Sequence, residues 1–122
     1  MDIETVHDVT FWGRIQTTGS SPNCFTGGIV GQLGGTCKNF HNCNIYAPSN
    51  IVGAGSGSFG STGAGLFASK SSSTAFDFAG SKVKKGTKVQ KIEITAENMA
   101  DAVIGRKHAS AVTNPPTIVD EF

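Results

Sequence analysis

The chain has 122 residues, a formal net charge of +1 and 16% charged residues. This length suits a single domain, and the near-neutral charge argues against a dedicated nucleic-acid binder, which is expected to be strongly basic. No apolar run approaches the roughly 20 residues that a membrane-spanning helix needs. With 16 Gly, 12 Ser and 12 Thr but only two Leu, the composition predicts short strands with tight turns and excludes a helical bundle.

The first residues, 1–4, carry neither the basic region nor the apolar core of a secretory signal peptide. We therefore expect an intracellular protein, or the mature part or a fragment of something larger. One domain is expected over 1–122, with a Gly-rich β repeat region at 1–91 and a C-terminal strand–helix cap at 92–122.

A repeated unit runs through much of the chain: a Gly-flanked apolar pair, a turn rich in Ser, Gly and Thr, and an alternating strand that carries Phe. The Gly-flanked pairs lie at 27–31 and 63–68, and the strands that follow them lie at 37–45 and 75–83. An earlier segment, 9–15, matches the strand part. Because a short apolar strand with small neighbours is buried only when it stacks on a copy, the repeats predict an all-β fold, a short right-handed β-solenoid. A compact β-sandwich is the alternative.

The aromatic residues divide into two groups. Trp12 is out of phase with Phe11, and Tyr46 lies just beyond an inward position, so both are expected on the outer face or in a loop. Exposed rings beside amides such as Asn42 and Asn44 are typical of sugar-binding surfaces, because a ring stacks on the apolar face of a pyranose. The second group consists of phenylalanines that alternate with polar residues along the chain, and this alternation predicts that they stack in the core. They are Phe11, Phe40, Phe76 and Phe78.

Five lysines fall within ten residues near the end of the repeat region: Lys82, Lys84, Lys85, Lys88 and Lys91. One interpretation is a patch that binds an anionic polysaccharide or phosphate. The favoured interpretation is a solvated β-hairpin in which Val83 and Val89 point inward, Gly86 supplies the turn and the lysines point outward. Exposed lysines on a strand also protect a sheet edge from pairing with a neighbour.

The tail is predicted to hold one helix, over 95–104, after a strand at 91–94. Thr95 is expected to be its N-cap, and Gly105 is expected to end it in the left-handed conformation. The helix would cover the open end of the solenoid, where unpaired strand backbone otherwise invites another chain. Residues 112–119 contain two prolines and are expected to form an irregular edge strand. The face of the helix that packs on the last repeat is expected to consist of Met99, Val103, Ala96 and Ala100.

No acidic residue lies between Asp8 and Asp77. That gap argues against paired-carboxylate hydrolysis and against carboxylate-rich calcium sites. The three histidines, His7, His41 and His108, are far apart in the sequence, and no serine stands in a nucleophile-elbow context. We therefore expect a non-enzymatic protein without catalytic residues and without a cofactor.

The three cysteines, Cys24, Cys37 and Cys43, are an odd number, so at least one thiol is free. We expect all three to be free core thiols, with a Cys37–Cys43 bridge as the alternative. A metal site at Cys37, His41 and Cys43 would lack a fourth ligand and the usual cysteine spacing, so no metal is expected.

Several of these segments resemble a known family. Gly-Gly-Ile-Val-Gly at 27–31 with Asn-Cys-Asn-Ile at 42–45 resembles GLUG-type repeats, and Ile-Thr-Ala-Glu-Asn at 94–98 resembles the segment with which such arrays often finish. The second unit departs from this pattern, because Gly-Leu-Phe-Ala stands at 65–68 and no Asn-Cys follows. The resemblance implies a β-solenoid of adhesin type, from large secreted or lipid-anchored bacterial surface proteins, with no catalytic motif.

These features predict a non-enzymatic secreted or cell-surface repeat domain that acts as a structural scaffold or adhesin. The alternative is a carbohydrate-binding module that uses exposed aromatic residues, with Trp12, Tyr46, Asn42 and Asn44 as its binding residues. The expected partner is a surface glycan or another protein, with self-association through the solenoid ends. Neither nucleic acid nor a membrane span in this chain is expected.

Overall fold

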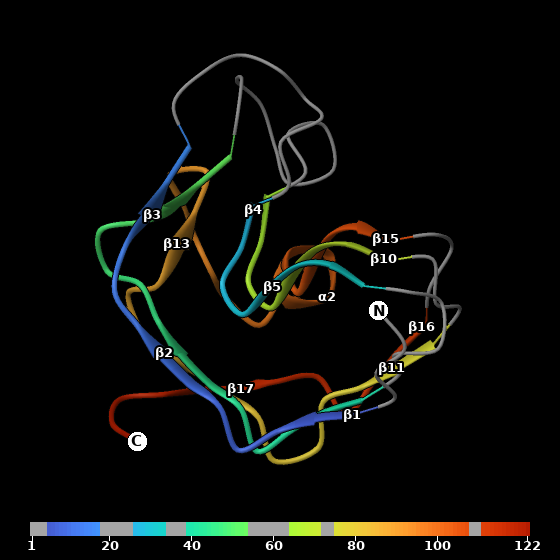
Figure 1. Ribbon diagram of the computed structural model, residues 1–122. Coiled ribbons are helices and arrows are strands. Elements are labelled where there is room, and N and C mark those ends of the chain that lie inside the picture. Colours follow the sequence, from blue (N-terminus) through green and yellow to red (C-terminus); the bar gives the residue numbers. More distant parts are fainter. Residues whose placement is uncertain (1–4, 18–25, 34–38, 54–63, 72–74, 108–110) are drawn as a thin grey trace.

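The computed structural model describes residues 5–17, 26–33, 39–53, 64–71, 75–107 and 111–122 (Figure 1). These residues form short strands and one short helix, so the predicted all-β class is confirmed for the described part of the chain. The strands belong to five sheets, which are named A to E below. Every strand pair in them is parallel except one.

Sheet A consists of β1 (Thr5–His7), β6 (Asn39–His41), β11 (Ala75–Asp77) and β16 (Ala111–Thr113), and sheet B of β2 (Thr10–Trp12), β7 (Asn44–Tyr46), β12 (Lys82–Lys84) and β17 (Thr117–Val119). Sheet C consists of β3 (Ile15–Gln16), β8 (Ile51–Val52), β13 (Lys88–Val89) and β14 (Ile92–Glu93). Sheet D consists of β4 (Thr26–Gly27) and β9 (Ala64–Gly65), and sheet E of β5 (Val30–Leu33), β10 (Ala68–Ser71) and β15 (Ile104–Lys107).

The chain visits sheets A, B, C, D and E in turn and then returns to sheet A. Each such circuit, called a pass below, lies beside the next, so that β2, β7, β12 and β17 follow one another across sheet B (Figure 1). In the third pass the helix α2 (Met99–Ala102) stands between the strands of sheets C and E, where the earlier passes have β4 and β9. The second unit is in register with the first, because Gly27 pairs with Gly65.

Alternation along each strand decides which side chains enter the core. In sheet B, Phe11 is paired with Ile45 and Ile45 with Val83, and the last two are fully buried. Four phenylalanines meet in the centre, with ring centroids 5.0 to 6.2 Å apart: Phe40, Phe67, Phe76 and Phe78. The predicted core positions of three of them are confirmed, whereas Phe11 is half-buried at the first pass.

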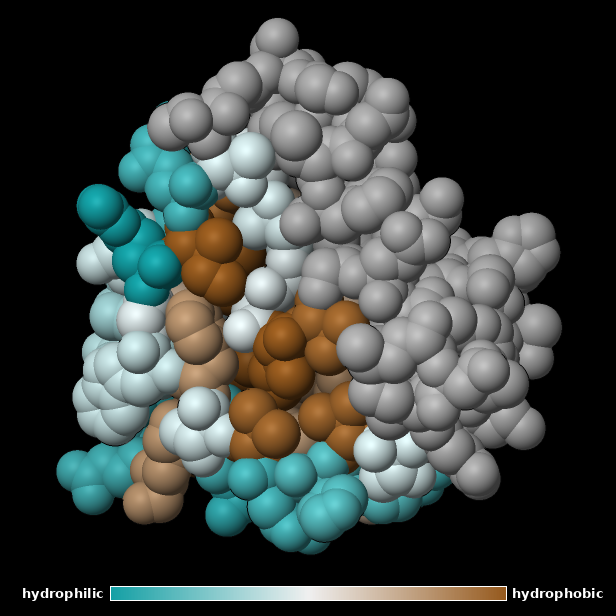
Figure 2. All heavy atoms as spheres, in the orientation of Figure 1, coloured by the Kyte–Doolittle hydropathy of each residue, from teal (hydrophilic) through white to brown (hydrophobic). Residues whose placement is uncertain are grey.

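The inward residues of the first pass pack against the core but stay partly exposed, because among the described strands they have a neighbouring pass on one side only. Figure 2 shows apolar residues gathered near the middle of one face of the molecule. The partly buried residues of the first pass are Val6, Val9, Phe11, Ile15, Ile29 and Val30.

The corner between sheets A and B is made by residues in the left-handed region. Asp8, Asn42, Gly80 and Asn114 have φ values of 58°, 56°, 76° and 47°, and one of them occurs in each pass. Asp and Asn tolerate this conformation better than other residues with a side chain, and Gly adopts it without steric cost. The left-handed backbone conformation therefore occurs four times at this corner, once in each pass.

The predicted helix is shorter than expected. It covers Met99–Ala102, with Asn98 at the N-cap and Val103 at the C-cap, instead of 95–104. Thr95 does not cap it: its backbone N–H donates to Oδ1 of Asn98, 2.8 Å away. Gly105 does not end the helix in the left-handed conformation, since it is a buried residue of β15.

The packing face of the helix is confirmed in part. Met99 and Val103 are buried, as expected, but Ala96 and Ala100 are exposed, and Ala102 packs inward instead. The tail 112–119 does lie at sheet edges, as two strands rather than one: β16 ends sheet A and β17 ends sheet B.

The predicted hairpin around Gly86 is wrong. Residues 82–84 and 88–89 belong to different sheets, B and C, so Gly86, with a φ of 94°, lies at a corner between sheets. The hairpin is the next turn along, where β13 and β14 pair antiparallel and Gln90 and Lys91 have φ values of 53° and 65°. Val83 and Val89 are buried, as predicted.

Of the cysteines, Cys43 lies within the described residues, and Cys24 and Cys37 lie outside them. Cys43 is a free, buried thiol, in agreement with the expected core thiol. Burial raises the pKa of the Cys43 thiol. Hydrogen bonding with the backbone of Val9 acts in the opposite direction but is the smaller effect. The predicted role of a small buried hydrophobe therefore fits Cys43.

Candidate binding face on sheet B

The outer face of sheet B collects side chains from three passes. The same alternation that turns Phe11 inward turns Thr10 and Trp12 outward, and the register pairs Trp12 with Tyr46. Lys84, on the third pass, lies on the same outer face. An aromatic pair and an ammonium group thus come together on one surface.

The two rings and the lysine are in direct contact. Trp12 and Tyr46 have ring centroids 4.9 Å apart and planes inclined by 85°, an edge-to-face arrangement. Nζ of Lys84 lies 4.8 Å from the centroid of Trp12 and 4.3 Å from that of Tyr46. Phe122 adds a third ring, 6.4 Å from Trp12. Trp12 is 63% exposed, so the predicted outward position of this residue is confirmed.

A polar row runs beside the rings. Thr10 pairs with Asn44 and Asn44 pairs with Lys82, and Nδ2 of Asn44 donates to Oγ1 of Thr10 at 3.2 Å. Asn42 is not part of this face: it is an exposed corner residue whose amide oxygen lies against Gly80. Of the four residues predicted for carbohydrate binding, the structure thus brings together Trp12, Tyr46 and Asn44.

The five lysines do not form a single row. Lys82 and Lys84 belong to β12 in sheet B, and Lys85 follows them at the corner. Lys88 belongs to β13 in sheet C, and Lys91 lies in the turn after it. Among the described residues none of the five forms an ion pair with a carboxylate. Lys84 is the lysine that joins the predicted basic patch to the predicted aromatic site, a link that neither prediction contained.

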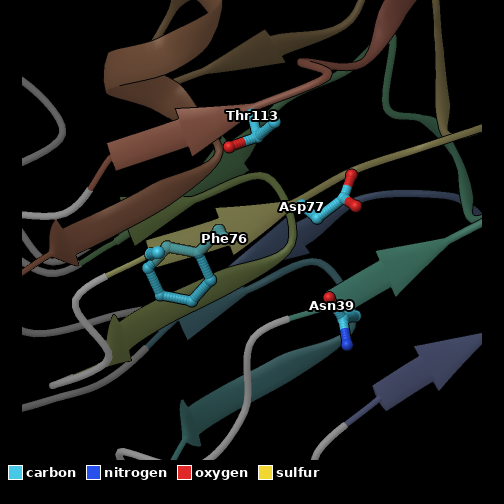
Figure 3. A pocket seen from close by; sticks show the side chains of 5 residues that line it. Asn39, Phe76, Asp77 and Thr113 are labelled. Atoms are coloured by element: carbon cyan, nitrogen blue, oxygen red, sulfur yellow. The ribbon is translucent and has the colours of Figure 1, made fainter.

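A second polar group lies on sheet A. A pocket of about 200 Å³ is lined by Asn39, Ala75, Phe76, Asp77 and Thr113, from three neighbouring strands (Figure 3). The carboxylate of Asp77 accepts hydrogen bonds from the backbone N–H of Ala79 at 2.9 Å and from Nδ2 of Asn114 at 3.2 Å. Nε2 of His41 lies 3.5 Å from Oδ2 of Asp77, the other oxygen of the same carboxylate.

The hydrogen-bond partners of Asp77 affect its pKa. The hydrogen bond from Asn114, with smaller contributions from Ala79 and His41, lowers the pKa of Asp77. The hydrogen bonds of Asp77 connect β11 to Ala79 and Asn114 at the corner between sheets A and B.

The described residues contain no group of three or more His, Cys, Asp or Glu side chains that could hold a metal ion. His108 lies outside the described residues. Within those residues, no helix is both long and apolar enough to cross a membrane.

No family model, curated protein or solved structure matches the chain.

Proposed function

We propose that the chain is a short right-handed β-solenoid and that it works as a non-enzymatic module of a secreted or cell-surface protein, a scaffold of adhesin type. The strand pairing supports the solenoid. Thr5 pairs with Asn39, 34 positions later, and equivalent parallel pairs recur in sheets A to E. A β-sandwich joins its strands mainly as antiparallel neighbours, whereas here antiparallel pairing is confined to β13 and β14 among the described strands.

The scaffold function is supported by the way the passes build outward faces. In sheets A and B each pass contributes one short strand, so side chains from distant parts of the chain come together on one outward face. Sheet B is the example: Thr10, Asn44, Lys82 and Thr117 form one outward row. The sequence resemblance to GLUG-type repeats favours a surface location.

The second candidate function is carbohydrate binding, and one observation favours it: the contact of Trp12, Tyr46 and Lys84 on the outer face of sheet B. A large, 63% exposed Trp ring beside the polar row of Thr10, Asn44 and Lys82 offers stacking and hydrogen bonding to a sugar. Both candidates are binding functions with a surface glycan or another protein as partner, and neither requires a cofactor.

A glycan array with the purified chain separates the two candidates. For the carbohydrate-binding module we expect saturable binding that is lost in Trp12→Ala and kept in Thr113→Ala, which changes an exposed residue of sheet A. Absence of saturable glycan binding would leave the scaffold candidate alone. The solenoid is tested by amide NMR contacts that connect Phe11, Ile45, Val83 and Ile118 in this order, and antiparallel contacts between consecutive strands other than β13 and β14 would contradict it.

A further inference from the structure

Lys84 lies over ring surfaces on which a sugar could stack. Its ammonium lies 4.3 Å from the centroid of Tyr46 and 4.8 Å from that of Trp12, so it covers part of both ring surfaces. Contacts of this kind between an ammonium and an aromatic face are attractive. A ligand that stacks on the covered surfaces must first draw Lys84 away from them.

We propose that Lys84 makes the face on sheet B selective for anionic sugars, such as uronic acids or sulfated sugars. This inference rests on the proposed carbohydrate-binding function of the same face. The carboxylate or sulfate group of the sugar forms a charge-assisted hydrogen bond with the Lys84 ammonium, which moves off the rings, and the pyranose ring stacks on the uncovered surface. A neutral sugar has to displace the ammonium without forming an ion pair in return.

The surroundings of Lys84 support an anionic ligand. Lys82 lies two residues earlier on the same outer face, and Lys85 follows at the corner. Neither these lysines nor Lys84 forms an ion pair with a described carboxylate. Asp120 and Glu121 follow β17, the strand next to β12, and they are exposed without reaching ion-pair distance of these lysines. The positive charge of the face is therefore available to a ligand.

A nucleic acid is the main competing ligand class, because stacked rings and lysines also bind single strands. The net charge of +1 favours a short anionic sugar over a long polyanion, as does the small aromatic surface: among the described residues this face offers one ring pair with a flanking Phe122. The experiment includes a single-stranded oligonucleotide for this reason.

The test uses Trp fluorescence. Trp12 is the only Trp of the chain, so any ligand-induced change reports on this face. The probes are hexagalacturonate with its fully methyl-esterified form, and sulfated cellohexaose with cellohexaose; in both pairs the second sugar is neutral and the sugar backbone is kept. We expect each acidic form to bind at least about tenfold more tightly than its neutral form at low salt.

Three variants assign the selectivity to one side chain. Lys84→Gln should bring the acidic-to-neutral affinity ratio close to one, mainly by weakening the acidic ligand, while Lys84→Arg should keep the preference. Lys91→Gln removes a charge from the turn beyond sheet C and should leave the ratio nearly unchanged. Far-UV circular dichroism checks that each variant folds.

The outcomes separate this inference from the proposed function. Equal binding of acidic and neutral forms to the unchanged chain would overturn the selectivity and keep carbohydrate binding. No response of Trp12 to any of the four sugars would overturn both. A preference that survives in Lys84→Gln, or tighter binding of a single-stranded oligonucleotide than of any acidic sugar, would also overturn the inference.

Discussion

The ring of Phe78 stacks on the ring of Phe40, with centroids 5.6 Å apart and planes inclined by only 9°. Phe78 also contacts Phe67 and Phe76, so one side chain joins the inward rows of the second and third passes. We expect Phe78→Ala to lower the free energy of unfolding by about 3–5 kcal/mol, because it removes buried contacts and leaves a cavity. Urea unfolding followed by circular dichroism measures this loss.

Phe122→Ala is the matched control for that experiment. Phe122 is 44% exposed and contacts Trp12 at the surface, so its removal should change the stability by no more than about 0.5 kcal/mol. Similar losses in the two variants would contradict the central position of Phe78.

Gly80 and Gly86 both have a positive φ but differ in what surrounds them. A Cβ at Gly86 meets nothing within 4 Å, whereas a Cβ at Gly80 collides with the amide oxygen of Asn42. Gly86→Ala should therefore cost only the backbone strain, about 1 kcal/mol, and Gly80→Ala should cost about 1 kcal/mol more. Thermal or urea unfolding of both variants gives the difference.

The extra cost at Gly80 is assigned with a second substitution. In an Asn42→Gly background, which keeps the positive φ of that corner residue possible, Gly80→Ala and Gly86→Ala should cost the same. An excess cost at Gly80 that persists without the Asn42 side chain would show that the contact is not its source.

Thr87 is fully buried, and its Oγ1 accepts a hydrogen bond from the backbone N–H of Ala47 at 3.1 Å. Thr87→Val keeps the shape of the side chain but leaves this buried N–H unpaired, so we expect a loss of about 1–3 kcal/mol in unfolding free energy. Thr10→Val removes an equivalent acceptor for Asn44 from an exposed position and should be nearly neutral. The prediction fails if the two variants unfold at the same urea concentration.

Acidification should weaken the corner between sheets A and B. The pKa of Asp77 lies below its ordinary value of 3.8, chiefly because Asn114 donates a hydrogen bond to it. A carboxyl group whose pKa is lower in the folded than in the unfolded chain adds stability above the unfolded value, and this contribution is lost as the pH falls through the folded value. We expect Asn114→Gly, which tolerates the positive φ, to raise the pKa of Asp77 toward 3.8.

Carbon-13 NMR of the carboxyl groups measures this pKa directly. Thr113→Ala serves as the control, because Thr113 lines the same pocket without donating to Asp77 in the structure. An unchanged pKa in Asn114→Gly would show that the amide is not the main cause of the shift.

The inward and outward phases of the strands could be predicted from the sequence because they depend on local alternation. Phe40, Phe76 and Val83 are buried and Trp12 is exposed for this reason. The hairpin could not be predicted in the same way. Gln90 and Lys91 adopt positive φ values without being glycines, and the backbone N–H of Lys91 donates to the side chain of Asn50, 41 positions away.

The length of the helix also depends on distant contacts. Backbone N–H groups of Leu66 and Phe67 donate to the carbonyl oxygens of Ala102 and Val103, so the chain leaves the helix at that point to follow the second pass. Local propensity at Thr95 and Gly105 carries no information about these partners. The contact of Lys84 with Trp12 could not be predicted from the sequence either, because it depends on which strands become neighbours.

The edge position of β2 has a consequence for how the aromatic face holds together. Among the described strands β2 pairs only with β7, and the inward residue Phe11 is half-buried while its equivalents Ile45 and Val83 are fully buried. In stacked repeats each layer is stabilised by its immediate neighbours, so a layer with one described neighbour opens before layers that have a neighbour on both sides. Trp12 should then separate from Tyr46 in a local opening that leaves the rest of the molecule folded. A ligand that bridges the two rings would slow this opening, in the way that one more layer of strands would.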